Sequence, residues 1–236
     1  MNPEERLIVA LDLPSTEEAK KLVQTLNGLV SFFKVGLILY SLGGPDFVEW
    51  LRERGKNVFL DLKLFDIPET VEKTVANVAK TGVSFLTVHG NAKIIEHAVR
   101  GRGNSSLKLL AVTVLTSLDA EDIQDLGFPC SVDELVLHRA KKALACGCDG
   151  VVASGRETRL IRSELGNGLL IVTPGIRPEA SGKKEGDMQK RIVTPREAIA
   201  AGADYLVVGR PVVKSPQPRL AAAQILEEVA SANPSP

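Results

Sequence analysis

Short, nearly continuous apolar runs recur along the chain and alternate with longer polar stretches that have helical patterns. Runs rich in Val, Ile, Leu and Phe, without an alternation of polar residues, are typical of parallel strands that are covered on both faces. The chain contains such runs at 7–11, 32–36, 58–62, 83–88, 109–115, 150–153, 169–172 and 205–208. The pattern therefore predicts eight parallel strands.

Several of the polar stretches begin with recognisable helix N-termini. Ser15, Ser131 and Thr194 stand where a side-chain oxygen can cap a helix, and acidic residues follow each of them. Pro68 and Pro195 suit the first turn of a helix, where a missing N–H costs nothing. Glycines precede three of the predicted strands, where a helix C-cap belongs: Gly82, Gly147 and Gly202.

Eight strand–helix units within 236 residues predict an α/β fold, the (β/α)8 TIM barrel. A doubly wound open sheet is the structural alternative. No Pro/Gly/Ser-rich linker divides the chain, so we expect residues 1–236 to form a single domain with a frayed tail at 231–236. Long polar loops are expected at 117–129 and 175–191, each after a strand end, where lids commonly occur.

Composition narrows the class of protein. The chain has 29 Lys+Arg and 29 Asp+Glu, and 44% of its residues are hydrophobic. This excludes a largely disordered chain, and neutrality argues against a dedicated binder of nucleic acid or anionic membranes. Cys130, Cys146 and Cys148 are odd in number and spaced C-x-C, which does not suit a disulfide framework. Neither a signal peptide nor a membrane-length apolar run is visible, so we expect a cytoplasmic protein.

Charged residues stand at the ends of the first three predicted strands. Asp12 follows the first strand, Lys34 lies within the second, and Asp61 and Lys63 end the third. Residues two apart in a strand share a side, so Asp61 and Lys63 are expected to face the same way. Lys34 has apolar neighbours and needs a carboxylate partner, for which Asp12 and Asp61 are candidates. A purely structural ion-pair network is the alternative, although buried pairs seldom add net stability.

These charges have chemical consequences. A lysine beside two carboxylates keeps its proton, so it suits a proton donor better than a Schiff-base nucleophile. A carboxylate held beside an anionic substrate group would repel it. After the seventh and eighth strands, Gly175 with Arg177 and Gly209 with Arg210 combine a close backbone approach with a cation. Because barrels often bind phosphate at these loops, the sequence predicts a phosphate site there.

The stretch from Asp61 to Thr70, DLKLFDIPET, resembles the signature of the orotidine 5′-phosphate decarboxylase family. Segments at the other strand ends resemble that family in the same order, over nearly the whole chain. The resemblance implies a metal-free and cofactor-free carboxy-lyase that converts orotidine 5′-phosphate to UMP and CO2, the last step of de novo pyrimidine synthesis. It makes Lys63 the donor of the proton to C6 of the pyrimidine and places Asp61 against the substrate carboxylate.

The resemblance also implies how the rest of the site is built. Lys34 and Asp12 would bind the ribose hydroxyls and orient the charged array. Asp66 and Thr70 would reach into the site of a neighbouring subunit, which implies a homodimer. The other implied substrate-binding residues are Thr116 and Ser154 near the pyrimidine ring, Gln189, Gly209 and Arg210 at the phosphate, and Arg177 on the closing loop.

Two other functions remain possible from the sequence. Mg²⁺-dependent sugar-phosphate decarboxylases of the same superfamily share an Asp-x-Lys-x-x-Asp motif, but an acidic residue on their second strand helps to hold the metal. This chain has Lys34 there, and an ammonium cannot bind a cation. A non-catalytic phosphate-binding barrel would not need Lys63 between Asp61 and Asp66. His89, at the end of the fourth strand, is expected to make a structural hydrogen bond, and lining the site is the alternative.

Overall fold

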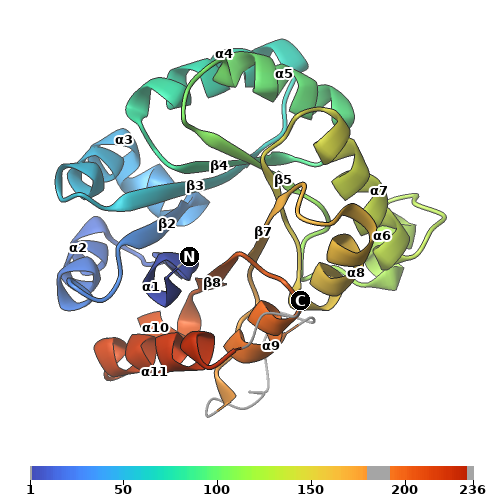
Figure 1. Cartoon of the computed structure of the whole chain (residues 1–236). Helices are drawn as coiled ribbons and strands as arrows, with labels where there is room; N and C mark the ends of the chain where they lie inside the picture. The colour runs from blue at the N-terminus through green and yellow to red at the C-terminus, as the bar shows by residue number, and fades with distance from the viewer. Residues whose placement is uncertain (1, 180–191, 233–236) are drawn as a thin grey trace.

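Eight parallel strands close into a barrel in the computed structural model, which describes residues 2–179 and 192–232 (Figure 1). They pair in sequence order, and the last strand pairs with the first, which confirms the predicted barrel and excludes an open sheet. The strands are β1 (Leu7–Ala10), β2 (Phe32–Gly36), β3 (Asn57–Leu64), β4 (Phe85–His89), β5 (Lys108–Val112), β6 (Gly150–Val152), β7 (Leu170–Thr173) and β8 (Tyr205–Val208).

Helices surround the barrel and connect its strands (Figure 1). The longer ones are α2 (Thr16–Thr25), α3 (Leu37–Glu53), α4 (Pro68–Val78), α5 (Ala92–Arg102), α7 (Val132–Ala145), α8 (Gly155–Leu165) and α11 (Pro218–Ala230). The short ones are α1 (Pro3–Arg6), η1 (Ala79–Thr81), α6 (Ala120–Asp125), α9 (Pro195–Ala200) and α10 (Arg210–Val213). Ser15, Ser131 and Thr194 cap α2, α7 and α9 as predicted, because each side chain accepts a backbone hydrogen bond from the third helical residue. Among the described residues, no helix is long and apolar enough to span a membrane.

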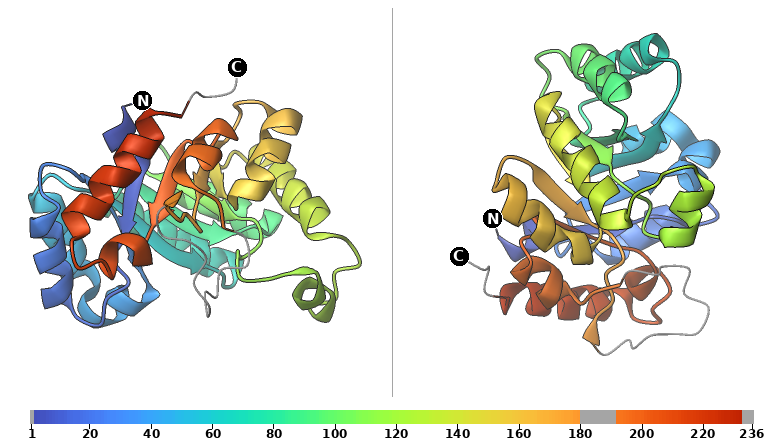
Figure 2. Two further views of the ribbon diagram at one scale, coloured as in Figure 1. Left: turned by 90° about the horizontal axis from the view of Figure 1, so that it is seen from below. Right: turned by 90° about the vertical axis from the view of Figure 1, so that its right-hand side faces the viewer.

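The structure contains a helix in the first expected long loop and leaves most of the second outside the described residues. The segment 117–129 contains α6, which Asp119 caps by accepting hydrogen bonds from the N–H groups of Glu121 and Asp122. Figure 2 shows α6 standing away from the barrel, at the end opposite to α1. Residues 180–191 of the second segment lie outside the described residues, and so does most of the expected frayed tail, residues 233–236.

The apolar core has two layers because strand side chains alternate between the two faces of the barrel wall. A large outer cluster joins the strands to the helices, and a smaller inner cluster fills the barrel. The inner cluster consists of Ile8, Ala10, Phe32, Phe59, Phe85, Leu110, Val172 and Val207. These residues form an apolar floor beneath the carboxyl ends of the strands.

Candidate active site

A polar layer lies directly above the apolar floor, at the carboxyl ends of β1 to β4. Because every second residue of a strand points inward, the positions two residues beyond the floor also face the interior. Those positions carry polar side chains above floor residues Ala10, Phe32, Phe59 and Phe85: they are Asp12, Lys34, Asp61 and Thr87. The register agrees, since Ala10 pairs with Lys34 and Lys34 with Phe59.

Four of the charged side chains form a continuous row of alternating sign. Nζ of Lys34 lies 3.1 Å from Oδ1 of Asp12 and 3.4 Å from Oδ2 of Asp61. Nζ of Lys63 lies 2.8 Å from Oδ1 of Asp61. The predicted partners of Lys34 are therefore the observed ones. We call Asp12, Lys34, Asp61 and Lys63 the charged row.

Burial differs along the charged row. The side chains of Lys34 and Asp61 are only 9% and 14% exposed, whereas those of Lys63 and Asp12 are 36% and 47% exposed. Burial raises the pKa of Asp61, but the ammonium groups of Lys34 and Lys63 and the hydrogen bonds from Lys63 and Thr87 outweigh it. The pKa of Asp61 therefore lies below its ordinary value, and the carboxylate is ionised at neutral pH.

Asp61 and Lys63 meet on one side, as predicted, although β3 is not regular there. Leu60 pairs with Leu86 and Leu64 with Val88, so three residues of β3 lie opposite the single residue Thr87. Lys63 has φ of 48° and is the one non-glycine residue with positive φ in the described part of the chain. The ammonium reaches Asp61 from a bulge rather than from an extended strand.

Two residues of this site were not identified from the sequence. Thr87 is fully buried and hydrogen-bonded to both Lys63 and Asp61. Gly36 ends β2, and a Cβ placed there would lie 2.9 Å from both Asp12 Oδ1 and Lys34 Nζ. A side chain at position 36 would therefore push against the ion pair. A threonine inside an apolar strand and a glycine at a strand end are weak signals by themselves.

His89 does not make the structural hydrogen bond that we expected. Its Nδ1 atom is buried, and no described residue serves as its hydrogen-bond partner. The ring instead packs against Phe65, with the ring centres 4.3 Å apart. Burial, followed by the positive charge of Arg139, lowers the pKa of His89. A neutral imidazole thus supports the loop that carries Asp66.

The candidate phosphate-binding residues lie at the ends of β7 and β8. Gly209 follows β8 and lies close to β1, since an added Cβ would be 3.6 Å from Cβ of Ala10. Arg210 follows it as the exposed first residue of α10. The guanidinium of Arg177 donates to the carbonyl of Ile176. Gln189 lies outside the described residues, so the structure does not place it.

The remaining candidates have different environments. Thr116 lies in the turn after β5. Ser154 is fully buried, and its hydroxyl donates to Glu157 within the cap of α8, so its side chain already has a structural partner. Asp66 and Thr70 are exposed, and Asp66 accepts a hydrogen bond from the N–H of Ile67. In the described residues, Asp66 makes no ion pair with the charged row.

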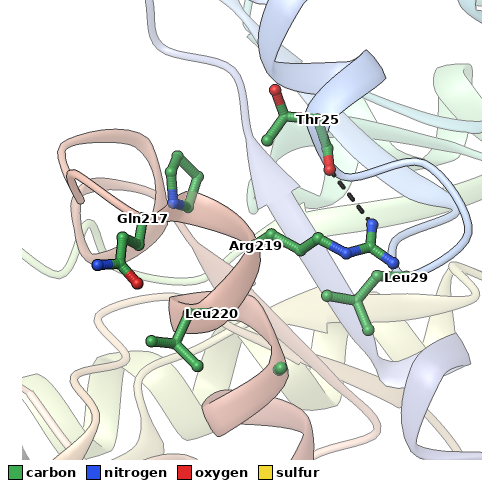
Figure 3. Close-up of a pocket in the computed structure, with 7 residues that line it drawn as sticks. Thr25, Leu29, Gln217, Arg219 and Leu220 are labelled. Atoms are coloured by element: carbon green, nitrogen blue, oxygen red, sulfur yellow. Dashed lines mark hydrogen bonds between the residues drawn. The ribbon is translucent and has the colours of Figure 1, made fainter.

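A surface hollow between α2 and α11 is a different place (Figure 3). Its lining is mostly apolar, with Leu29 and Leu220 facing it. Its cation, Arg219, donates to the carbonyls of Thr25 and Asn27, at 3.3 and 2.8 Å. This hollow holds none of the charged row.

Comparisons with known proteins agree with this geometry. Residues 5–225 match the model of the Orotidine 5'-phosphate decarboxylase / HUMPS family. A protein of Nitrobacter winogradskyi named orotidine 5'-phosphate decarboxylase is 53% identical over 97% of this chain and 94% of its own length. One of Methylococcus capsulatus with the same name is 55% identical over 92% of this chain and 89% of its own. The crystal structure of orotidine 5'-phosphate decarboxylase from Lactobacillus acidophilus superposes with a TM-score of 0.83 at 36% identity, covering 95% of this chain and 99% of that one. The chain therefore belongs to the orotidine 5'-phosphate decarboxylase / HUMPS family.

Proposed function

We propose that this protein is a carboxy-lyase that converts orotidine 5′-phosphate to UMP and CO2, the last step of de novo pyrimidine nucleotide synthesis. The observation that carries the proposal is the charged row, which places an accessible ammonium beside a buried carboxylate at the mouth of a barrel. The names of the relatives at 49–55% identity support the same substrate. The cytoplasmic location expected from the sequence stays a prediction.

The chemical step needs a stabilised carbanion and a proton. The bond between C6 and the carboxylate carbon breaks, CO2 leaves, and the electron pair stays on C6. The ammonium of Lys63 stabilises that developing charge and then transfers one proton to C6, which completes UMP. The resulting neutral amine regains its proton from solvent. Lys63 suits this role because it donates to Asp61 and has further N–H groups for a ligand.

Asp61 would act on the reactant rather than on the product. Its carboxylate is ionised and buried, so a substrate carboxylate placed beside it is repelled. That repulsion disappears when CO2, which is neutral, departs. An interaction that is worse in the ground state than in the transition state raises kcat.

Binding energy from the rest of the nucleotide must hold the substrate against that repulsion. We place Lys34 and Asp12 on the ribose hydroxyls, because Lys34 lies beside Asp61 and pairs with Asp12, whose side chain is accessible. Gly209 and Arg210 suit the phosphate at the end of β8, as in many barrels. In this proposal Gln189 contacts the phosphate, Arg177 lies on the closing loop and Thr116 lies near the pyrimidine ring. Ser154, the N-cap residue of α8, also lies near the ring.

A second copy of the chain is the partner that we propose for the exposed apolar residues near the site. Phe65 and Ile67 are 63% and 70% exposed and flank Asp66, and Leu37, Ile38 and Leu42 of α3 are also exposed. Exposed apolar side chains that follow the carboxyl ends of β2 and β3 suit an interface. A homodimer would cover them and carry Asp66 and Thr70 into the neighbouring site.

Mixing two inactive variants tests the shared site. Lys63→Ala and Asp66→Asn protomers, once subunit exchange is verified, should form hybrid dimers in which one site has both native residues. Partial recovery of turnover is expected. Hybrids that stay inactive would rule out the contribution of Asp66 across the interface.

The Mg²⁺-dependent alternative fits these residues poorly. Nζ of Lys34 lies between the carboxylates of Asp12 and Asp61, at the place where a metal would need open oxygen ligands. In the part of the chain that the structure describes, no three His, Cys, Asp or Glu side chains gather to hold a metal ion.

The decisive assay follows the loss of orotidine 5′-phosphate by ultraviolet absorbance, with EDTA in one series and with added Mg²⁺ in a second. We expect turnover that is indifferent to the chelator. Absence of turnover by folded protein would overturn the proposed function, and a requirement for added Mg²⁺ would favour the sugar-phosphate class instead.

A further inference from the structure

Thr87 of β4 contacts both residues on which the proposed chemistry depends. Its side chain is fully buried. Its Oγ1 atom accepts a hydrogen bond from the backbone N–H of Lys63 at 2.9 Å and donates one to Oδ1 of Asp61 at 3.0 Å. One hydroxyl can do both, because it has one donor and two acceptor lone pairs.

The bulge in β3 explains why this side chain is needed. Leu60 pairs with Leu86 and Leu64 pairs with Val88, so three residues of β3 lie opposite one residue of β4. Regular strand pairing therefore cannot satisfy all the backbone groups of these three residues. The hydroxyl of Thr87 takes the N–H of Lys63 in place of a backbone carbonyl. It does so at a residue with φ of 48°, a conformation that side chains with a Cβ rarely adopt.

We propose that Thr87 is a positioning residue, whose hydroxyl fixes the backbone of Lys63 relative to the carboxylate of Asp61 and so aims the ammonium at the reacting carbon. This inference rests on the proposed function. Thr87 acts through Lys63 and Asp61, because its own hydroxyl is occupied by both. The same bond to Asp61 helps to keep that carboxylate ionised.

Substitutions at position 87 separate the hydroxyl from the volume of the side chain. Thr87→Ser keeps both hydrogen bonds, whereas Thr87→Val keeps the shape and loses both. Thr87→Ala also loses both hydrogen bonds, but it places no methyl group against the unpaired N–H of Lys63. It therefore serves if the valine variant folds poorly. Thr113→Val is the matched control, because Thr113 is equally buried and its hydroxyl donates to the carbonyl of Val152 at 2.8 Å.

Steady-state kinetics should show a specific pattern. We expect kcat to fall by about 10- to 100-fold in Thr87→Val and Thr87→Ala, the effect of losing hydrogen bonds to charged or strained groups, with KM unchanged. Thr87→Ser should restore most of kcat. The acid limb of kcat/KM should move to higher pH in Thr87→Val, since loss of the hydroxyl raises the pKa of Asp61. Thr113→Val should lower thermal stability without these changes.

Amide hydrogen exchange at Lys63 gives a readout that needs no activity. Exchange should accelerate in Thr87→Val and Thr87→Ala, and stay slow in Thr87→Ser and Thr113→Val. Parent-like kcat in folded Thr87→Val, or an equal loss of kcat in Thr113→Val, would overturn the inference. If the parent protein lacks turnover, the proposed function fails. Unchanged exchange at Lys63 in Thr87→Ala would then also refute the positioning contact, and faster exchange would support it.

Discussion

Both ends of the barrel carry largely buried carboxylates, but the groups that bind these carboxylates differ between the two ends. At the carboxyl ends of the strands, Asp61 forms an ion pair with Lys34 and accepts hydrogen bonds from the side chains of Lys63 and Thr87. At the amino ends, Asp149 accepts from the backbone N–H of Leu109 at 2.9 Å, and from side chains that include Arg102.

Asp204 repeats the arrangement at the amino ends. It accepts from the backbone N–H of Ile171 at 2.7 Å and from Arg162, which also donates to the carbonyl of Gly202. Carboxylates that take a strand N–H and an arginine fork have little capacity left for a ligand. The charged row instead leaves donors of Lys63 and oxygens of Asp12 accessible. Backbone partners thus distinguish the ion pairs of Asp149 and Asp204 from those of the charged row.

The largest expected effect separates two lysines that each pair with an aspartate. Lys63→Ala should lower kcat by at least about 10⁴-fold, because it removes both the proton donor and an electrostatic contribution. Binding of UMP, measured by calorimetry, should persist. Lys108→Ala is the control, since Lys108 pairs with Asp149 at 3.1 Å on the opposite end. Substantial turnover by Lys63→Ala would make the charged row structural as well.

Two aspartates give the next contrast. Asp149→Ala should lower the free energy of unfolding by about 3–5 kcal/mol, because it leaves buried charge and a strand N–H without a partner. Folded Asp149→Ala should keep its kcat. Asp61→Asn should instead lower kcat by about 10²–10³-fold, as for other lost electrostatic groups, and change stability less. Urea unfolding and steady-state assays measure both. Equal losses of stability in Asp149→Ala and Asp61→Asn would contradict the distinction between a structural carboxylate at the amino ends and a functional one at the carboxyl ends.

A smaller effect is expected from Gly36→Ala. The new Cβ lies 2.9 Å from atoms of Asp12 and Lys34, so the ion pair must shift. We expect kcat/KM to fall by about tenfold or more, mainly through KM, because misplaced binding groups weaken positioning of the substrate. Gly168→Ala, which meets a flexible leucine side chain at the amino end of β7, should have parent-like kinetics. Unchanged KM in Gly36→Ala would mean that the pair adapts.

The smallest effect concerns pH and His89. Because its pKa is lowered in the folded protein by burial and then by Arg139, the unfolded chain binds the proton more readily. The related stability is complete above the unfolded value of about 6.5 and is lost as pH falls toward the folded value. His89→Phe should therefore flatten the decline of thermal stability between neutral pH and about pH 5.5. An identical decline in both proteins would show that His89 does not contribute.

Much of the fold was predictable because it depends on local pattern. The ranges 32–36 and 205–208 agree with β2 and β8, and the helix caps were visible as residue types. The helix α6 was missed although Asp119 and Asp122 form a capping box, since its six residues show little periodicity. Strand β3 extends to Leu64 because the bulge adds residues.

The candidate site was predictable in its charges and less so in its supports. Asp12, Lys34, Asp61 and Lys63 stood out because charges at apolar strand ends need partners. Thr87 could not be found in this way, since its meaning depends on which residues of β3 lie opposite β4. The environment of His89 also depends on tertiary packing, because its contact with Phe65 cannot be seen in the sequence.

The bulge has a consequence for protein engineering. Because three residues of β3 fit opposite Thr87, the segment Asp61–Leu62–Lys63 and the facing threonine form one transplantable unit. On an unbulged barrel strand the aspartate and the lysine would still share a face, but the lysine would lose the φ of 48° and the threonine contact that set its backbone relative to the aspartate. A designer who wants this ammonium–carboxylate pair elsewhere should copy a piece of two strands, together with the shift in register between them.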